Sequence, residues 1–384
     1  MKHKVLRTAT IADSTYTLLK GQLGFLNKEF EIVSVSSDSN LLEEIKLREG
    51  VRVKAILIKR KISLFFDLKS LFDLCLFFYK EKPSIVHSIT PKAGLLSMIA
   101  AKIVGVPIRI HTFTGLIFPT KKGMFQKLLI QMDKILCACA TNIYPEGIGV
   151  KNDLEKFGIT TKPLKVIANG NVNGIDANYF DLTQVDNIDL IKIKNELLIA
   201  SDDFIFIFVG RLVGDKGINE LVSCFDRLSK DSKNVKLLLV GGLETDLDPL
   251  QKVTLDTMRT NKQILSVGFQ KDVRPYLVLS DCLVFPSYRE GFPNVVMQAG
   301  AMSLPSIVSD INGCNEIIIE GENGVIIPVK DADAIFDAMQ NMMLSHEFRN
   351  QLKVNARQMI ISRYEQKVVW EALLKEYQLL LQNV

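Results

Sequence analysis

The sequence alternates short apolar segments with longer amphipathic segments, and this alternation restricts the fold more than any other feature. Segments of helix length, such as 66–80 and 91–104, lie between the apolar ones, and the pattern is helical from about residue 331. Strands that alternate with helices form parallel sheets covered on both faces. We therefore expect an α/β protein with doubly wound parallel sheets. The expected strands are 4–9, 30–35, 53–58, 84–89, 107–112 and 164–169, then 204–210, 235–242, 264–268, 282–287 and 305–310.

The expected strands fall into two series, and the chain of 384 residues is longer than one hydrophobic core usually supports. The polar segment 177–190 interrupts the alternation between the two series. We expect two Rossmann-like domains, at residues 1–180 and 181–365, that face each other across a cleft. A helix over about residues 366–384 is expected to pack back on the first domain.

Composition excludes several classes of protein. No run of about 18 apolar residues predicts a membrane span, and the first residues lack the apolar core of a signal peptide, so we expect a cytoplasmic location. Six scattered cysteines without a CxxC pair predict free thiols and no zinc site. Residues 1–180 carry 26 Lys and Arg against 15 Asp and Glu, whereas the remainder carries 21 against 28. The basic half indicates an anionic partner, although solvated charges would give the same pattern.

Open parallel sheets bind ligands beyond the carboxyl ends of their strands, so polar residues after strands are the candidate site residues. In the segment FVGRLVGDKGINEL (208–221), Arg211 follows a strand and Lys216 lies at a helix start. A guanidinium and an ammonium there suit a phosphate or diphosphate, although a glycine-rich turn with solvated charges is the alternative. The chain has no Walker loop, and no GxGxxG follows the first strand, which disfavours a nicotinamide dehydrogenase.

The segment SYREGFPNVVMQAGAM (287–302) follows another expected strand. A helix is expected to begin near Asn294, so that the amides of Asn294, Val295 and Val296 are free to hold an anion. Upstream of them, Glu290 can accept hydrogen bonds from hydroxyl groups, and Gln298 lies about one turn into the helix. This set suits a polyhydroxylated ligand that carries phosphate, and a capped helix beside a solvated glutamate is the alternative.

Two histidines and two acidic pairs complete the candidates. His87 and His111 belong to neighbouring expected strands, which favours one of them lining the ligand site, although a single histidine there is more often structural. The acidic pairs Asp246-Leu247-Asp248 and Asp331-Ala332-Asp333 have the DxD spacing of some metal-dependent sugar-nucleotide sites. Neither follows an apolar strand closely, so we interpret both as turn or helix-start residues.

Several motifs in order resemble the C-terminal half of family 4 retaining glycosyltransferases, which have the two-domain GT-B fold. These motifs are GRLVGDKG, LLLVGG, SVGFQKDVRPYLVLSDCLVFPSYREGFPNVVMQAGAM and LPSIVSDINGCNEIIIEGENG. In the first half, SITPKAGLLSMIAAKIVGVPIRIHTFTGL and IANGNVNGID resemble the subgroup that acts on polyprenyl-diphosphate-linked sugars in bacterial surface polysaccharide and glycan assembly.

The resemblance implies roles for the candidate residues. Arg211 and Lys216 would hold the donor diphosphate and stabilise the leaving nucleotide without a metal, and no cofactor is implied. Glu290 would bind donor sugar hydroxyls, with His111 beside the transferred sugar. Gln298 replaces the usual glutamate that binds ribose, which puts donor affinity in doubt. The backbone amides of four residues would contact the donor sugar and phosphate; these are Phe292, Asn294, Val295 and Val296. Gly242 and Phe269 would shape the pocket for the base.

The resemblance also implies the partners. The donor would be a nucleotide sugar, UDP-linked, and the acceptor a lipid-linked saccharide at the inner face of the plasma membrane, contacted through Lys92, Gly115, Lys121 and Lys122. No nucleic acid is implied. A GT-B sugar-nucleotide epimerase and an inactive GT-B binding or scaffold subunit stay open as alternatives.

The segment KRKISLFFDLKSLFDLCLFFYK (59–80) joins basic residues, among them Lys59, Arg60 and Lys61, to five phenylalanines. The five cannot all lie on one face of a helix, and Phe65 and Phe66, near the helix start, are expected to be exposed. Exposed aromatic residues beside basic ones suit an anionic membrane surface, whereas a core helix with a solvated basic start is the alternative.

Overall fold

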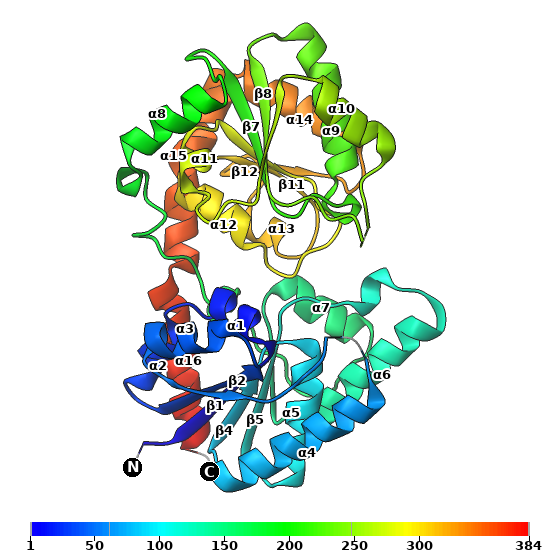
Figure 1. Cartoon of the computed structure of the whole chain (residues 1–384), viewed down its shortest axis with the longest axis vertical. Helices are drawn as coiled ribbons and strands as arrows, with labels where there is room; N and C mark the ends of the chain where they lie inside the picture. The colour runs from blue at the N-terminus through cyan, green and yellow to red at the C-terminus, as the bar shows by residue number, and fades with distance from the viewer. Residues whose placement is uncertain (1, 61, 247, 383–384) are drawn as a thin grey trace. The chain divides into compact units, whose positions relative to one another are not determined.

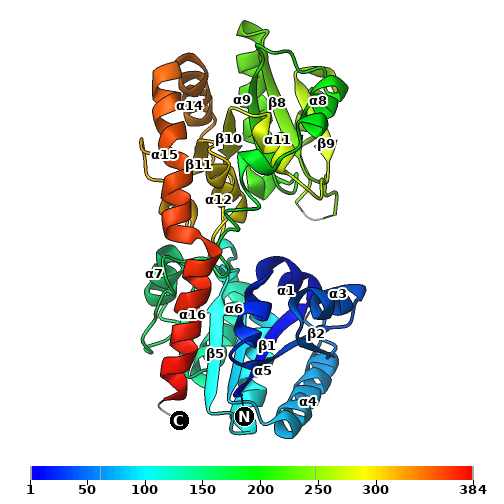
Figure 2. The same ribbon diagram turned by 90° about the vertical axis from the view of Figure 1, so that its left-hand side faces the viewer.

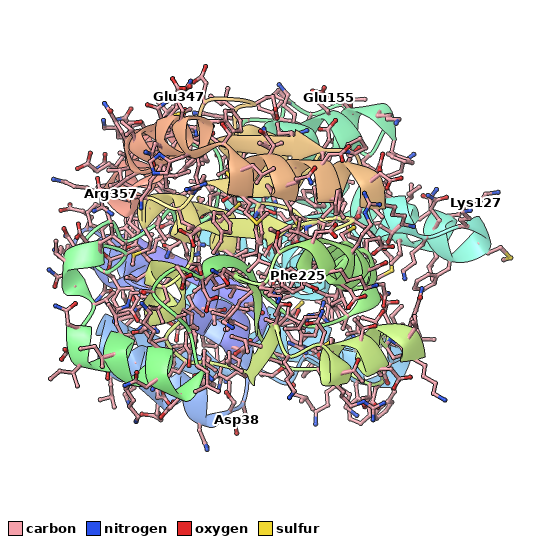
Figure 3. All side chains as sticks on the ribbon, turned by 90° about the horizontal axis from the view of Figure 1, so that it is seen from above. Asp38, Lys127, Glu155, Phe225, Glu347 and Arg357 are labelled. Atoms are coloured by element: carbon pink, nitrogen blue, oxygen red, sulfur yellow. The ribbon has the colours of Figure 1, made fainter. Side chains whose placement is uncertain are left out.

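The computed structural model describes residues 2–60, 62–246 and 248–382 and divides into two compact units (Figure 1). Unit 1 consists of the residues up to 174 together with those from 366 onward, and unit 2 of residues 175–365. The polar segment after residue 174 belongs to unit 2, where the guanidinium of Arg357 donates to the carbonyl oxygen of Phe180 and pairs with Asp181 at 2.6 Å (Figure 3). These bonds hold the segment against the helix His346–Tyr364, which carries Arg357.

Unit 1 is built on six parallel strands in the order β3-β2-β1-β4-β5-β6. The strands are β1 (Lys4–Ile11), β2 (Glu31–Ser37), β3 (Arg52–Ala55), β4 (Ile85–Ser88), β5 (Ile108–Phe113) and β6 (Asn142–Pro145). The helices are α1 (Ala12–Leu18), α2 (Gln22–Asn27), α3 (Asn40–Glu49), α4 (Leu64–Glu81), α5 (Pro91–Ile103), α6 (Gly123–Cys139), α7 (Ile148–Lys156) and α16 (Gln366–Leu381), with a 3₁₀ turn, η1, at Phe118–Thr120.

Helices cover both faces of this sheet because neighbouring strand residues point to opposite sides. Val5 packs in a core with α2, α3 and α16, whereas Leu6 packs in a second core with α4, α5 and α6. Figure 2 shows α16 lying along the sheet of unit 1. The apolar runs of the strands therefore reflect burial on both faces.

Unit 2 has six parallel strands in the order β12-β11-β10-β7-β8-β9. Its strands are β7 (Phe204–Val209), β8 (Val235–Val240), β9 (Ile264–Gly268), β10 (Cys282–Phe285), β11 (Ser306–Ser309) and β12 (Gly324–Ile327). Its helices are α8 (Asn187–Glu196), α9 (Ile218–Asp231), α10 (Lys252–Thr260), α11 (Arg274–Val278), α12 (Asn294–Ala301), α13 (Cys314–Ile317), α14 (Ala332–Leu344) and α15 (His346–Tyr364), with 3₁₀ turns η2 (Leu182–Gln184) and η3 (Gly214–Lys216). Phe225 of α9 is fully buried in its core (Figure 3).

The predicted fold class is confirmed, although the expected strand at 164–169 is wrong. That segment turns away at Ala168, whose φ is 50°, and only Leu164 makes an isolated bridge, to Ile143. The sixth strand of unit 1 is β6 instead, and unit 2 gains β12, which was not expected. The residues of β6 are NIYP, with a single aliphatic side chain and a proline at the end, and those of β12 are GVII, with a glycine at the start. Proline and glycine are both unfavourable in strands, so neither segment was expected to be one.

The two sheets share one topology, which fixes where ligands can bind. Counted within each unit, the strand order is that of the Rossmann fold, and the order reverses between β1 and β4 and between β7 and β10. A crevice opens at such a switch point, beyond the carboxyl ends of the two strands. Candidate residues should therefore follow these four strands.

Candidate active site

The structure brings the loops after β7 and β10 into contact at the switch point of unit 2. The backbone of Gly217 has a φ of +70°, and a Cβ added there would lie 2.2 Å from the carbonyl oxygen of Pro286. Only glycine fits this left-handed position against another backbone. The close approach sets the loop of Lys216 beside the loop of Glu290.

Lys216 and Glu290 form an ion pair in which Nζ donates to Oε1. Their side chains are only 15% and 16% exposed, so the pair is largely removed from water. The hydroxyl of the buried Ser287 donates to the same Oε1 at 2.8 Å. Among the described residues nothing donates to Oε2 of Glu290, which leaves that oxygen as a free acceptor. Ser287 was not among the residues expected from the sequence, although its position two residues after β10 is a signal.

Arg211 also follows β7, but its guanidinium is engaged elsewhere. Its NH1 group pairs at 2.5 Å with Glu244, in the loop after β8, and its side chain is 56% exposed. An exposed pair of this kind stabilises by about 1 kcal/mol at most. An anion at the switch point could therefore draw Arg211 away from Glu244 at little cost.

The start of α12 differs in part from the expectation. The helix begins at Asn294 as expected, but the amide of Val296 donates to the carbonyl oxygen of Pro293 at 3.2 Å, so it is not free. The ring of Phe292 packs edge-on against Tyr364 with 5.4 Å between ring centroids. Phe292 could therefore meet a ligand through its backbone rather than its ring.

Two of the remaining donor-side candidates, Gly242 and Phe269, are open to solvent. Gly242, after β8, has no atom within 4 Å of an added Cβ, and Phe269, after β9, is 80% exposed. Both lie at the carboxyl edge of the sheet, as Arg211 does, because the strands are parallel. Gln298 is half-buried in α12, and its side-chain amide has no hydrogen-bond partner among the described residues.

The acidic DxD pairs are engaged in local structure. Asp331 caps α14 by accepting from the amide of Ala334 at 2.9 Å, as expected of a helix-start residue. In the loop after β8, Asp248 accepts from the amide of Asp215 at 2.5 Å, and Leu247 lies outside the described residues. Within the part of the chain that the structure describes, no group of three or more His, Cys, Asp or Glu is placed to hold a metal ion.

In unit 1, His111 lies near the carboxyl end of β5 and is 1% exposed. Its Nδ1 lies 2.8 Å from the hydroxyl of Ser88, which itself donates to the carbonyl oxygen of Ile110 at 3.3 Å. Ser88 is therefore the acceptor from Nδ1–H, and Nε2 carries a lone pair with no partner among the described residues. Burial lowers the pKa of His111 to about 3, so the ring is neutral at physiological pH.

His87 has a structural environment. Its Nδ1 lies 2.6 Å from the hydroxyl of Tyr377 and 2.7 Å from the guanidinium of Arg7, and its Nε2 lies 2.7 Å from the hydroxyl of Thr112. Burial, followed by the charge of Arg7, lowers the pKa of His87 well below its usual value. The ring is fully engaged in joining the sheet to α16.

Two of the four expected acceptor-side residues, Lys92 and Gly115, line a chamber of about 210 Å³ in unit 1. The ammonium of Lys92 pairs with Asp67 at 2.6 Å. Lys121 and Lys122 are exposed in the loop before α6 and do not line the chamber.

The outer surface of α4 is apolar. Phe65, Leu68, Phe72, Leu76 and Tyr79 recur at helical spacing and are 43% to 75% exposed. The expectation for Phe65 is confirmed. The expectation for Phe66 is wrong, because its ring is half-buried beneath the ammonium of Lys59, 3.2 Å from the ring centroid. Lys61 lies outside the described residues.

Two doubly wound parallel sheets, one in each unit, form the architecture of GT-B glycosyltransferases. Family models match both parts of the chain: Glycosyl transferases group 1 over residues 190–359, and Glycosyl transferase 4-like over residues 6–146. The capsular polysaccharide biosynthesis glycosyltransferase CapM of Staphylococcus aureus is 34% identical over 376 residues, which are 97% of this chain and 96% of CapM.

Another relative is the UDP-Gal:alpha-D-GlcNAc-diphosphoundecaprenol alpha-1,3-galactosyltransferase of Escherichia coli. It is 29% identical over 346 residues, which are 88% of this chain and 86% of that protein. A glycosyltransferase from Rickettsia africae ESF-5 has the same fold, with a TM-score of 0.83 at 19% identity and 100% of both chains covered. The chain belongs to the group 1, family 4-like glycosyltransferases, which confirms the family and the enzyme class inferred from the motifs. Over the described residues, no helix combines the length and apolar character that crossing a membrane requires.

Proposed function

We propose that this glycosyltransferase moves a sugar, with retention of configuration, from a UDP-sugar bound by unit 2 to a polyprenyl-diphosphate-linked saccharide bound by unit 1. The observation that carries the proposal is the Lys216–Glu290 pair at the switch point, with Oε2 of Glu290 free. A cation and a hydroxyl acceptor side by side match a sugar joined to a diphosphate. The names of the Staphylococcus aureus and Escherichia coli relatives support the assignment to surface polysaccharide assembly on a lipid carrier.

The donor chemistry follows from the charges. Transfer breaks the bond between the anomeric carbon and a diphosphate oxygen, so negative charge grows on the leaving UDP. Lys216 lies in a largely buried position where its charge is weakly screened, and Arg211 can join it by leaving Glu244. Both side chains stabilise the leaving group more as its charge develops, which is the condition for accelerating the reaction.

Two hydrogen-bond acceptors without a partner among the described residues, Oε2 of Glu290 and Nε2 of His111, orient the donor and acceptor sugars. Oε2 of Glu290 accepts from donor sugar hydroxyls, and Nε2 of His111 accepts from a sugar hydroxyl on the side of unit 1. With a pKa of about 3, His111 is a poor base at neutral pH. The proton of the attacking acceptor hydroxyl therefore passes to an oxygen of the leaving diphosphate, and the acceptor oxygen forms the new bond to the anomeric carbon.

The acceptor lies in a membrane, and unit 1 has a surface suited to one. The apolar residues on the outer face of α4 stand beside basic residues, among them Lys59, Arg60 and Lys69. Each well-placed basic residue adds about 1 kcal/mol at an anionic surface. We propose that the enzyme is peripheral on the inner face of the plasma membrane.

The test is a screen of nucleotide sugars against a short-chain polyprenyl-diphosphate-linked sugar, read by mass spectrometry. We expect one UDP-sugar to add one sugar to the acceptor, and Lys216→Met to slow the addition by about 10²- to 10³-fold while the protein stays folded. Conversion of the nucleotide sugar to an epimer without acceptor would replace this proposal with the epimerase alternative. Nucleotide-sugar binding without any turnover would favour the binding subunit.

A further inference from the structure

The chamber in unit 1 combines an apolar wall with an open side. It lies among the segment before α4, the start of α5, the loop after β5 and the face of α6. Much of its wall is hydrocarbon or aromatic, from residues that include Leu95, Phe113, Leu116, Leu129 and Met132. Apolar cavities of ~150 Å³ in proteins stay dry and bind benzene. At about 210 Å³ the chamber exceeds that size, and one isoprene unit is close in size to benzene.

The chamber continues into an exposed apolar surface. Ile62, Ile117 and Phe125 belong to its lining and are 52%, 42% and 48% exposed. Next to Phe125 along α6, Met124 is 88% exposed. A hydrocarbon chain longer than the chamber could leave it over apolar side chains without crossing a polar rim.

The lining of the chamber includes two cations, Arg60 and Lys92. Arg60 is exposed and lies directly before the apolar surface of α4. Lys92 is at the second position of α5, where the helix dipole also favours an anion, and is held by Asp67 at 2.6 Å. The lining also includes one carboxyl group, that of Asp133, so the chamber is apolar with two cations and one carboxyl group. This set complements a molecule that joins a hydrocarbon chain to a diphosphate.

We propose that this chamber binds the first isoprene units of the acceptor's polyprenyl chain, with Arg60 and Lys92 pairing with the adjoining diphosphate. The inference rests on the proposed function and adds that the enzyme recognises the lipid as well as the sugar. The tail of a bilayer phospholipid would also fit an apolar wall. The presence of two cations, Arg60 and Lys92, favours the diphosphate, because it carries more negative charge than the phosphodiester of a phospholipid.

The experiment measures binding of farnesyl diphosphate to the full chain by isothermal titration calorimetry, with inorganic diphosphate and farnesol as partial ligands. We expect farnesyl diphosphate to bind roughly a hundredfold more tightly than diphosphate, because burying even a few methylene groups changes affinity by this order. Arg60→Gln should weaken farnesyl diphosphate and leave farnesol unchanged. A dihexanoyl phosphatidylglycerol that competes as well as farnesyl diphosphate would overturn the proposal in favour of bilayer lipid.

Two adjacent leucines of α6 provide a matched pair of variants. Leu129 lines the chamber, whereas Leu128 is 48% exposed and does not. Leu129→Trp should fill the chamber and remove the preference for the farnesyl chain, and Leu128→Trp should keep it. Leu116→Asn, which makes the wall polar without adding bulk, should have the effect of Leu129→Trp if that variant fails to fold. Equal loss in Leu129→Trp and Leu128→Trp would overturn the proposal.

UDP binding and sugar transfer, measured in parallel, separate this proposal from the proposed function. If sugar is transferred but farnesyl diphosphate binds no better than diphosphate, the chamber proposal fails and the proposed function stands. If farnesyl diphosphate binds through Leu129 but no nucleotide sugar is used, the transfer reaction fails and the chamber stands as a site for prenyl diphosphates.

Discussion

Replacing Asp133 by asparagine should stabilise unit 1 at neutral and alkaline pH and remove a pH dependence. Asp133 lies on α6 in the wall of the chamber, and burial raises the pKa of its carboxyl group from 3.8 to about 7. Between these two pH values the folded state keeps a proton that the unfolded state has released. The free energy of unfolding must therefore fall as pH rises from about 4 to about 7 and level off above that.

The magnitude follows from the size of the shift. A difference of about three pKa units corresponds to about 4 kcal/mol, at 1.36 kcal/mol per unit. The side chain is not fully buried and water can enter the open chamber, so we expect about 2 to 4 kcal/mol. This is a large part of the stability of an ordinary domain.

The assay is urea unfolding at pH 5, 6, 7 and 8, followed by the fluorescence of Trp370, the single tryptophan of the chain, which packs in unit 1. Asp38→Asn is the matched control, because Asp38 is an exposed aspartate of the same unit (Figure 3). Wild type and Asp38→Asn should lose stability between pH 5 and pH 8, and Asp133→Asn should lose much less. If Asp133→Asn follows the control at every pH, the charge of Asp133 is solvated and the burial argument is wrong.

Four further predictions concern the site and the membrane. Lys216→Met should lower kcat by about 10²- to 10³-fold, the usual effect of removing one preorganised charge-stabilising group, and near-normal turnover by a folded variant would refute the diphosphate assignment. EDTA should leave transfer intact, because side-chain cations face the diphosphate; loss that magnesium restores would contradict this. Gln298→Glu should tighten UDP binding by about 1 kcal/mol in calorimetry if the side chain meets ribose, and weaker binding would make the glutamine structural. Co-sedimentation with anionic vesicles should weaken in Phe65→Ser/Leu68→Ser but not in Leu344→Ser, an exposed leucine of unit 2, and wild-type protein that ignores the vesicles at low salt would refute the membrane proposal.

Much of the fold could be predicted because strands that are buried on both faces of a parallel sheet are mostly apolar, and this shows in the sequence. The long strand β7 is a continuous apolar run, and β8 is interrupted only by Lys236. The helix α5 was expected to end at residue 104 and ends at Ile103. The strand β6 (NIYP) ends in proline and β12 (GVII) begins with glycine, and because both residues are unfavourable in strands, neither strand was found. The apolar run at 164–169 was mistaken for a strand because pairing depends on backbone direction, which the left-handed Ala168 changes.

The positions of the candidate site residues could be predicted where they follow from the order of the strands alone. Lys216 and Glu290 follow strands that are neighbours in the sheet, so the alternation of elements already favours their meeting. Their direct pairing was not predictable, because it depends on the left-handed Gly217 and its contact with Pro286. The partner of Arg211 is Glu244, in a loop whose path the sequence does not specify.

The two switch points carry different chemical groups on one topology. In unit 2 the loops after β7 and β10 carry the Lys216–Glu290 pair, a charged arrangement suited to an anionic donor. In unit 1 the corresponding ends of β1 and β4 carry hydroxyl groups, with Thr10 and Thr90 hydrogen-bonded at 2.8 Å and the neutral His111 nearby on β5. Neutral donors and acceptors suit the hydroxyl groups of a sugar. Of the two cations that we propose for the acceptor diphosphate, Lys92 follows Thr90 by two residues at the start of α5, and Arg60 lies before α4. The sugar and the diphosphate of the proposed acceptor would therefore meet different but neighbouring groups of unit 1.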